Sequence, residues 1–155
     1  VGSAVDSLSG RGQMIVAPRV LFVCTRNSAR SILAAALWMR ASAVPVASAG
    51  TDPAPEVHPA AIRSAVRHGL ISSADLRVPS SRLGRPKQVS DVRQPGDVVV
   101  STCDEAREML VRGAPPSLHW SIADPVRAGT TAAFDKAVAD LSWRVARLAE
   151  VVAAT

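Results

Sequence analysis

Apolar runs and helical repeats alternate along most of the chain. The apolar run at residues 19–23 precedes a helical stretch at about 31–41, and a short strand at about 44–49 precedes a helix at about 59–68. Residues 98–100 are three consecutive valines, which is typical of a strand that is buried on both faces. The pattern in the first two thirds of the chain therefore predicts strands that alternate with helices.

The last third continues this alternation. We expect a helix at about 104–112, a short strand near 117–120 and a long amphipathic helix at about 130–153. Apolar residues recur on one face of that helix: Phe134, Val138, Leu141, Val145 and Leu148. Alternating strands and helices predict an α/β fold, a single-domain open parallel sheet of about four strands with helices on both faces.

Composition limits the domain count and the class of protein. With 155 residues, of which 48% are hydrophobic, the chain is long enough for one compact domain. Residues 1–17 are rich in Ser and Gly and show no period, so we expect a flexible leader or linker ahead of a domain at 18–155. No apolar stretch approaches the roughly 20 residues that span a bilayer, so no membrane contact is expected.

The net charge of +5 raises the possibility of nucleic-acid binding. The charges are scattered, aromatic residues make up only 3% of the chain and Tyr is absent, so we expect no nucleic-acid partner. The basic segment 77–93 is expected to be a solvated connecting loop, with an anion-attracting flap as the alternative.

The strongest chemical signal is the loop between the first strand and the first helix. It begins at Cys24 and ends at Arg30 and Ser31. Five residues lie between the cysteine and the arginine: Thr25, Arg26, Asn27, Ser28 and Ala29. Their backbone N–H groups can curl inward, and the helix adds its own N–H groups and the positive end of its dipole. With the planar fork of Arg30, this cradle fits a tetrahedral oxyanion and favours Cys24 as a nucleophilic thiolate.

The segment 20–31 resembles the signature of the low-molecular-weight protein tyrosine phosphatase superfamily, which includes the thiol-coupled arsenate reductases. The resemblance covers about residues 18–153. Further matches follow in chain order: Ser48-Ala49-Gly50-Thr51, Val57-His58-Pro59-Ala60, Gly69, Asp97-Val98-Val99-Val100, Cys103-Asp104-Glu105-Ala106, and His119-Trp120 with Asp124-Pro125.

The resemblance implies a role for four of these residues. Cys24 is the nucleophile, Arg30 the oxyanion clamp, Ser31 the hydroxyl that stabilises the thiolate and Asp124 the general acid. Cys24, Cys103 and Asp124 each follow a strand, and the carboxyl ends of parallel strands share one edge of the sheet. We therefore expect these three side chains at one site.

Cys103 has two interpretations. If its strand neighbours the first, the spacing of about 4.8 Å brings Cys103 and Cys24 near the distance that a disulfide requires. Cys103 is then either an inert core thiol or a resolving thiol that attacks a Cys24 adduct and leaves a Cys24–Cys103 disulfide. The segment 102–106 and His119-Trp120 resemble the reductases, which favours the resolving thiol. Phosphatases place aromatic residues after the acid, whereas Val126 and Arg127 follow it here.

Several positions depart from the family pattern. Gly is usual where Arg26 stands, so Arg26 either strains the loop or adds a second guanidinium at its rim. Ala29 replaces a Cys, Ala35 replaces an acidic residue, and Met109 and Leu110 occupy the neighbourhood of a second resolving Cys. An external thiol reductant is therefore expected to complete the cycle: thioredoxin, glutathione with glutaredoxin, or mycothiol.

These observations predict an arsenate reductase whose substrate is a small oxyanion and whose partner is a redoxin or a low-molecular-weight thiol. A free thiolate points to a reducing compartment, so we expect a cytoplasmic protein. No metal site is expected, because His58 and His119 are interpreted as structural. One alternative is a low-molecular-weight protein tyrosine phosphatase. The second is a non-catalytic oxyanion-binding regulatory module.

Overall fold

A four-stranded parallel sheet forms the centre of the computed structural model, which describes residues 14–72 and 84–155. The strand order is β3-β2-β4-β5, and every neighbouring pair is parallel. The bounds are β2 Val20–Cys24, β3 Val46–Gly50, β4 Val98–Ser101 and β5 Leu118–His119. The predicted α/β fold with about four parallel strands is confirmed.

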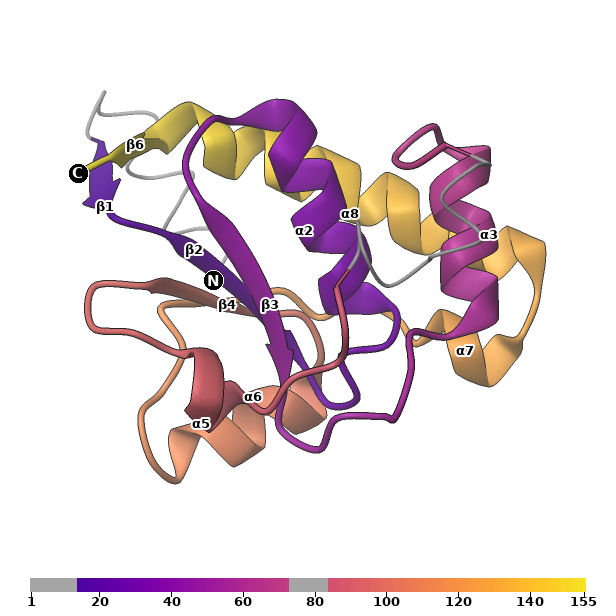
Figure 1. Ribbon diagram of the computed structural model, residues 1–155, viewed down its shortest axis with the longest axis horizontal. Helices are drawn as coiled ribbons and strands as arrows, with labels where there is room; N and C mark the ends of the chain where they lie inside the picture. Colours follow the sequence, from indigo (N-terminus) through magenta and orange to yellow (C-terminus); the bar gives the residue numbers. More distant parts are fainter. Residues whose placement is uncertain (1–13, 73–83) are drawn as a thin grey trace.

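Helices cover both faces of this sheet (Figure 1). The helices α2 (Arg30–Ala41), α3 (Pro59–Arg67) and α8 (Thr131–Val151) belong to one side, and α5 (Val89–Val92) and α6 (Asp104–Val111) to the other. The strands alternate between the two sides, because Phe22 and Val100 belong to the larger core cluster and Val23 and Val99 to the smaller one. A short helix, α7 (Pro125–Ala128), precedes α8.

The expectation of a leader without regular structure is wrong for residues 15–17. These residues form β1 (Ile15–Ala17), which pairs in parallel with β6 (Val152–Ala154) at the C-terminus. Three residues are too few to show a period, and the partner strand lies at the other end of the chain. The last helix consequently ends at Val151, two residues before its predicted end. The short helices α5 and α7 were not predicted either.

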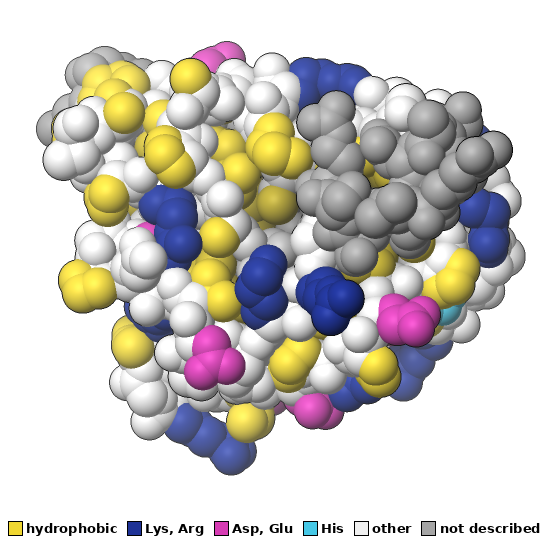
Figure 2. Space-filling model, in the orientation of Figure 1, with side chains coloured by type: hydrophobic (Ala, Val, Ile, Leu, Met, Phe, Trp, Pro, Cys, Tyr) yellow, Lys and Arg dark blue, Asp and Glu magenta, His cyan; other side chains and the backbone are white. Residues whose placement is uncertain are grey.

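Surface charge is interspersed on the face shown in Figure 2, where Lys and Arg side chains alternate with acidic and apolar ones. Among the described residues, no helix is long and apolar enough to cross a lipid bilayer. Residues 1–13 of the expected leader and residues 77–83 of the expected basic loop lie outside the described part of the chain.

Candidate active site

The loop between β2 and α2 is held by the neighbouring segment 51–58. Backbone N–H groups of that segment donate at 2.8–3.1 Å to four carbonyl oxygens of the loop, those of Cys24, Thr25, Arg26 and Ser28. In a planar trans peptide the N–H group points opposite to the carbonyl group. The N–H groups that follow these four carbonyls are therefore directed away from segment 51–58, as an oxyanion cradle requires.

Two residues allow the loop to curl this tightly. Asn27 has φ of +50°, and it is the one non-glycine residue with positive φ in the described part of the chain. Asn tolerates this left-handed conformation better than most residues. Gly50 ends β3 against the loop, where a Cβ atom would lie 2.6 Å from the carbonyl oxygen of Thr25. A side chain at position 50 would therefore displace the loop.

Cys24 ends β2, and its side chain is buried. Its Sγ accepts a hydrogen bond from the backbone N–H of Asn27 at 3.2 Å and lies 3.0 Å from Ser31 Oγ. Asn27 Nδ2 donates to Ser31 Oγ at 2.7 Å, while Asn27 Oδ1 accepts from the backbone N–H of Lys87 at 3.0 Å. Since Ser31 Oγ accepts from Asn27, its own proton is free to point at the sulfur. Two donors then converge on Cys24 Sγ, which suits a thiolate.

Arg30 is the first residue of α2, and its Nη1 donates to the carbonyl oxygen of Ile122 at 2.9 Å. This contact joins the start of the helix to the loop that follows β5. The N-cap residue, Ala29, supplies no side-chain cap, and the first turn of α2 carries no acidic residue. The N-terminal N–H groups of the helix therefore keep their capacity to bind an anion.

The expectation that Arg26 strains the loop is wrong. The left-handed residue is Asn27, and Arg26 is not among the residues with positive φ. The Arg26 side chain is exposed, and its Nη1 donates to the carbonyl oxygen of Asp52 at 3.0 Å and to its Oδ2 at 2.8 Å. The structure agrees with the second interpretation, in which Arg26 places another guanidinium at the rim of the loop.

Asp124 is exposed at the N-cap of α7, where its Oδ1 accepts from the backbone N–H of Val126 at 2.9 Å. It lines a cavity of about 430 Å³ together with Arg30, Cys103 and Arg127. The structure thus brings together a guanidinium, a carboxyl group and the second thiol. Among the residues that the structure describes, none of those lining this cavity is aromatic.

Cys103 follows β4 and occupies the N-cap position of α6. The strands β2 and β4 are neighbours, as expected, and Val23 pairs with Ser101. Both cysteines are free and buried in the smaller core cluster, and Cys103 Sγ lies 3.3 Å from Thr25 Oγ1. The second thiol is therefore in contact with the residue directly after the first.

A polar network beside Cys103 was missed by sequence reasoning. His119 lies 2.6 Å from Ser101 Oγ through Nδ1 and 2.7 Å from Asp104 Oδ1 through Nε2. Hydrogen bonds from His119, and then from Ser121, hold the pKa of the Asp104 carboxyl below its usual value. The sequence offered two separate signals, the position of Asp104 directly after Cys103 and the resemblance of His119-Trp120 to the reductases, but no pattern that joins them. In the described part of the chain, no group of three acidic, His or Cys side chains is arranged to hold a metal ion.

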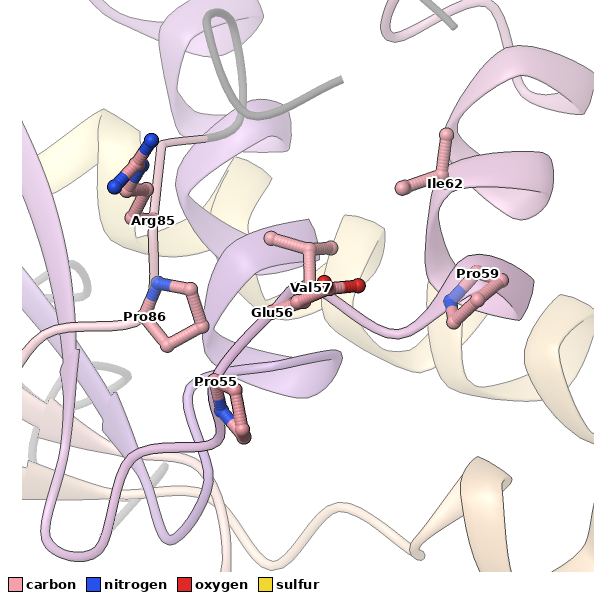
Figure 3. A pocket seen from close by; sticks show the side chains of 7 residues that line it. All are labelled: Pro55, Glu56, Val57, Pro59, Ile62, Arg85 and Pro86. Carbon is pink, nitrogen blue, oxygen red and sulfur yellow. The ribbon is translucent and has the colours of Figure 1, made fainter. Parts of the chain in front are cut away.

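Two clefts lie along segment 54–59, beside the loop. One, of about 530 Å³, has Pro55, Val57, Pro59, Ile62 and Pro86 as apolar walls, with Glu56 and Arg85 as its charged residues (Figure 3). The other, of about 480 Å³, shares residues 55–57 and Pro59 with it and reaches Arg26, Ser28 and Val126. An apolar surface thus extends from the loop rim along segment 54–59.

Comparison with known proteins gives one family and a group of solved structures. The family model for low molecular weight phosphotyrosine protein phosphatase matches residues 19–155. An arsenate reductase from Archaeoglobus fulgidus DSM 4304 is 26% identical, with a TM-score of 0.67 over 84% of this chain and 98% of that one. The YwlE arginine phosphatase from Geobacillus stearothermophilus is 25% identical, with a TM-score of 0.66 over 85% and 90%.

The tyrosine phosphatase Wzb from Escherichia coli K30, solved with sulphate, shares the fold. It has a TM-score of 0.69 and 23% identity over 86% of this chain and 97% of that one. A search of curated proteins gives no match.

Proposed function

Since the chain belongs to the low molecular weight phosphotyrosine protein phosphatase family and is an enzyme of that family, we propose that its reaction is the reduction of arsenate to arsenite. Cys24 is the nucleophile of this reaction, and the loop from Thr25 to Arg30 binds the oxyanion. The observation that carries the proposal is the second buried thiol, Cys103, with its Sγ 3.3 Å from Thr25 Oγ1. Phosphate-ester hydrolysis has no use for a second thiol at this position.

The first step makes a bond between sulfur and arsenic. The Cys24 thiolate attacks arsenic, and Asp124 donates a proton so that one arsenate oxygen leaves as water. Arg30 and the loop N–H groups stabilise the charge on the remaining oxygens. The hydroxyl of Ser31 and the N–H of Asn27 hold the sulfur in place before this attack.

The second step transfers two electrons to arsenic. The Cys103 thiolate attacks Cys24 Sγ, the sulfur–arsenic bond breaks, and its electron pair leaves with arsenic as arsenite. The product is a Cys24–Cys103 disulfide. A thiol reductant then returns two electrons to the disulfide; thioredoxin, glutathione with glutaredoxin, and mycothiol are the candidate partners.

Hydrolysis of phosphate esters is the second candidate function. It needs Cys24, Arg30, Ser31 and Asp124 but not Cys103. The observation that favours it is the apolar cleft at Pro55, Val57, Pro59 and Val126, which meets the loop rim at Arg26 and Ser28. Such a surface suits the organic group of an ester, whereas arsenate has no apolar part to place there.

One experiment compares the two reactions in the same preparation. Arsenite release is measured with each of the three reductant systems, beside hydrolysis of para-nitrophenyl phosphate. Cys24→Ser should abolish both activities, since both begin at that thiolate. Cys103→Ser should stop arsenate turnover through the internal disulfide and leave hydrolysis essentially unchanged.

Peptide mapping without reduction after arsenate treatment should show Cys24 joined to Cys103 in the wild type. Hydrolysis without arsenite release by any reductant would assign the chain to the phosphatases. Absence of both activities, with phosphate still bound, would indicate an oxyanion-binding module.

A further inference from the structure

His119 links the edge strand of the sheet to the first residue of α6. Ser101 and His119 are paired in register on the parallel strands β4 and β5, so their side chains emerge on the same face. The preceding residues on the two strands, Val100 and Leu118, belong to the larger core cluster. Ser101 and His119 therefore lie on the opposite face, which α6 covers. There His119 Nδ1 meets Ser101 Oγ at 2.6 Å, and Nε2 meets Asp104 Oδ1 at 2.7 Å.

The same three residue types form hydrolytic triads, but this set cannot act as one. Ser101 is 0% exposed, so no substrate reaches its hydroxyl. The network instead has one end in the sheet and the other in the exposed carboxylate of Asp104. A buried His whose ring nitrogens are both occupied fixes the two groups that it joins.

The residue that this network fixes stands directly beside Cys103. Asp104 is the first residue of α6, and Cys103 is its N-cap. Helix ends fray unless side chains hold them, and Cys103 has no side-chain cap hydrogen bond of its own. Hydrogen bonds from His119 and Ser121 instead fix the Asp104 carboxylate, so it does not rotate freely beside the thiol.

We infer that His119 is a positioning residue for Cys103: by binding Asp104 it holds the first turn of α6 so that the Cys103 thiol stays against Thr25, ready to form a disulfide with Cys24. The inference deepens the proposed function, because it rests on Cys103 as the resolving thiol. A disulfide tolerates only a narrow range of Cα separations and directions, so a loosened first turn slows its formation.

The test measures disulfide formation without arsenate. Diamide, an azo oxidant, takes two electrons and two protons from the two thiols while one bond forms between Cys24 and Cys103. The rate is followed by acid quenching and mass spectrometry. His119→Asn keeps an amide near the Nδ1 position for Ser101 but does not reach Asp104, and it should slow disulfide formation about tenfold or more.

Three comparisons separate positioning from a general loss of structure. Hydrolysis of para-nitrophenyl phosphate reports on Cys24, and His119→Asn should leave it unchanged. His119→Gln, whose amide nitrogen reaches the Nε2 position, should restore most of the rate of disulfide formation. His68→Asn removes a His–Asp contact of 2.8 Å between α3 and α8 and should affect neither reaction.

Unchanged or faster disulfide formation in His119→Asn would overturn the inference, and so would equal losses in hydrolysis and disulfide formation. A wild type that forms no Cys24–Cys103 disulfide would overturn it too. Failure of the proposed function would give a different result: the protein would release no arsenite, but its disulfide would still form at a rate that depends on His119.

Discussion

At the residue scale, the chemistry of the site depends on Asn27. The backbone of Asn27 has the left-handed conformation, and its N–H donates to Cys24 Sγ. The side-chain amide of Asn27 joins Ser31 to the backbone of Lys87. The amide orientation follows from these contacts, since the Lys87 N–H can only donate to the oxygen. One residue thus sets the path of the loop and the direction of the Ser31 hydroxyl.

Substitution of Asn27 should separate these two roles. Asn27→Gly keeps the left-handed backbone and loses the side-chain bonds, at a cost of about 1–3 kcal/mol in the free energy of unfolding. Asn27→Ala should lose about 1–2 kcal/mol more, because alanine resists positive φ. Both variants should lose activity, since Ser31 is no longer held. Urea unfolding and hydrolysis assays check this, and equal stability of the two variants would contradict it.

Arg26 stands where the family usually has glycine, which suggests that Arg26→Gly would raise turnover, but the structure predicts the opposite. Because its backbone is not left-handed, Arg26→Gly relieves no strain and should not raise turnover. Loss of the exposed guanidinium should raise KM for arsenate or phosphate ester by a few-fold, equivalent to about 0.5–1 kcal/mol. Arg26→Lys, which keeps the charge, is the matched control. A higher turnover in Arg26→Gly would show that the loop is strained after all.

At the scale of elements, α3 and α8 are joined by Asp135, whose Oδ1 accepts from Arg67 and lies 2.8 Å from His68 Nε2. Hydrogen bonds from Arg67, and then from His68, lower the pKa of Asp135 from its ordinary value of 3.8. A carboxyl with a lowered folded-state pKa contributes stability that is fully present above its unfolded pKa. That contribution is lost as the pH falls through the lower, folded value.

Asp135→Asn should therefore lower the melting temperature at neutral pH, and the gap to the wild type should close as the pH falls below about 4. The gap should also shrink in high salt, because these groups are partly exposed. Asp140→Asn is a suitable control, since its bond to Arg144 lies within α8 and joins no second element. A gap that persists in acid would assign the effect to packing.

The elements also show how far the sequence predicted the site. The Cys24–Arg30 loop was predictable because its strand, loop and helix are contiguous, and Cys103 and Asp124 because the carboxyl ends of parallel strands share an edge. The pairing of Ser101 with His119 depends on strand register, and the Asn27–Lys87 bond joins residues 60 apart. Such contacts between distant residues leave no pattern in the local sequence. The same reason hid β1, whose partner is the C-terminus.

On the scale of the whole molecule, the proposed oxyanion site lies where the main structural parts meet. The loop joins β2, one of the two inner strands, to α2. Segment 51–58 holds the carbonyl groups of the loop, and Arg30 reaches the segment after β5. A ligand that binds this loop binds the folded state alone, because the unfolded chain has no cradle. Binding of an anion should therefore stabilise the entire domain.

Phosphate or arsenate at a hundred times its Kd should add about 2.7 kcal/mol to the free energy of unfolding, which is about 5–10 °C in Tm for a domain of this size. Chloride at equal ionic strength is the reference, because it screens surface charge without filling a tetrahedral site. Arg30→Ala should abolish most of the shift, whereas Arg112→Ala, which removes an exposed guanidinium after α6, should retain it. No shift in the wild type at millimolar anion would mean that the loop does not bind oxyanions, and an equal shift in both variants would place the anion elsewhere on this basic protein.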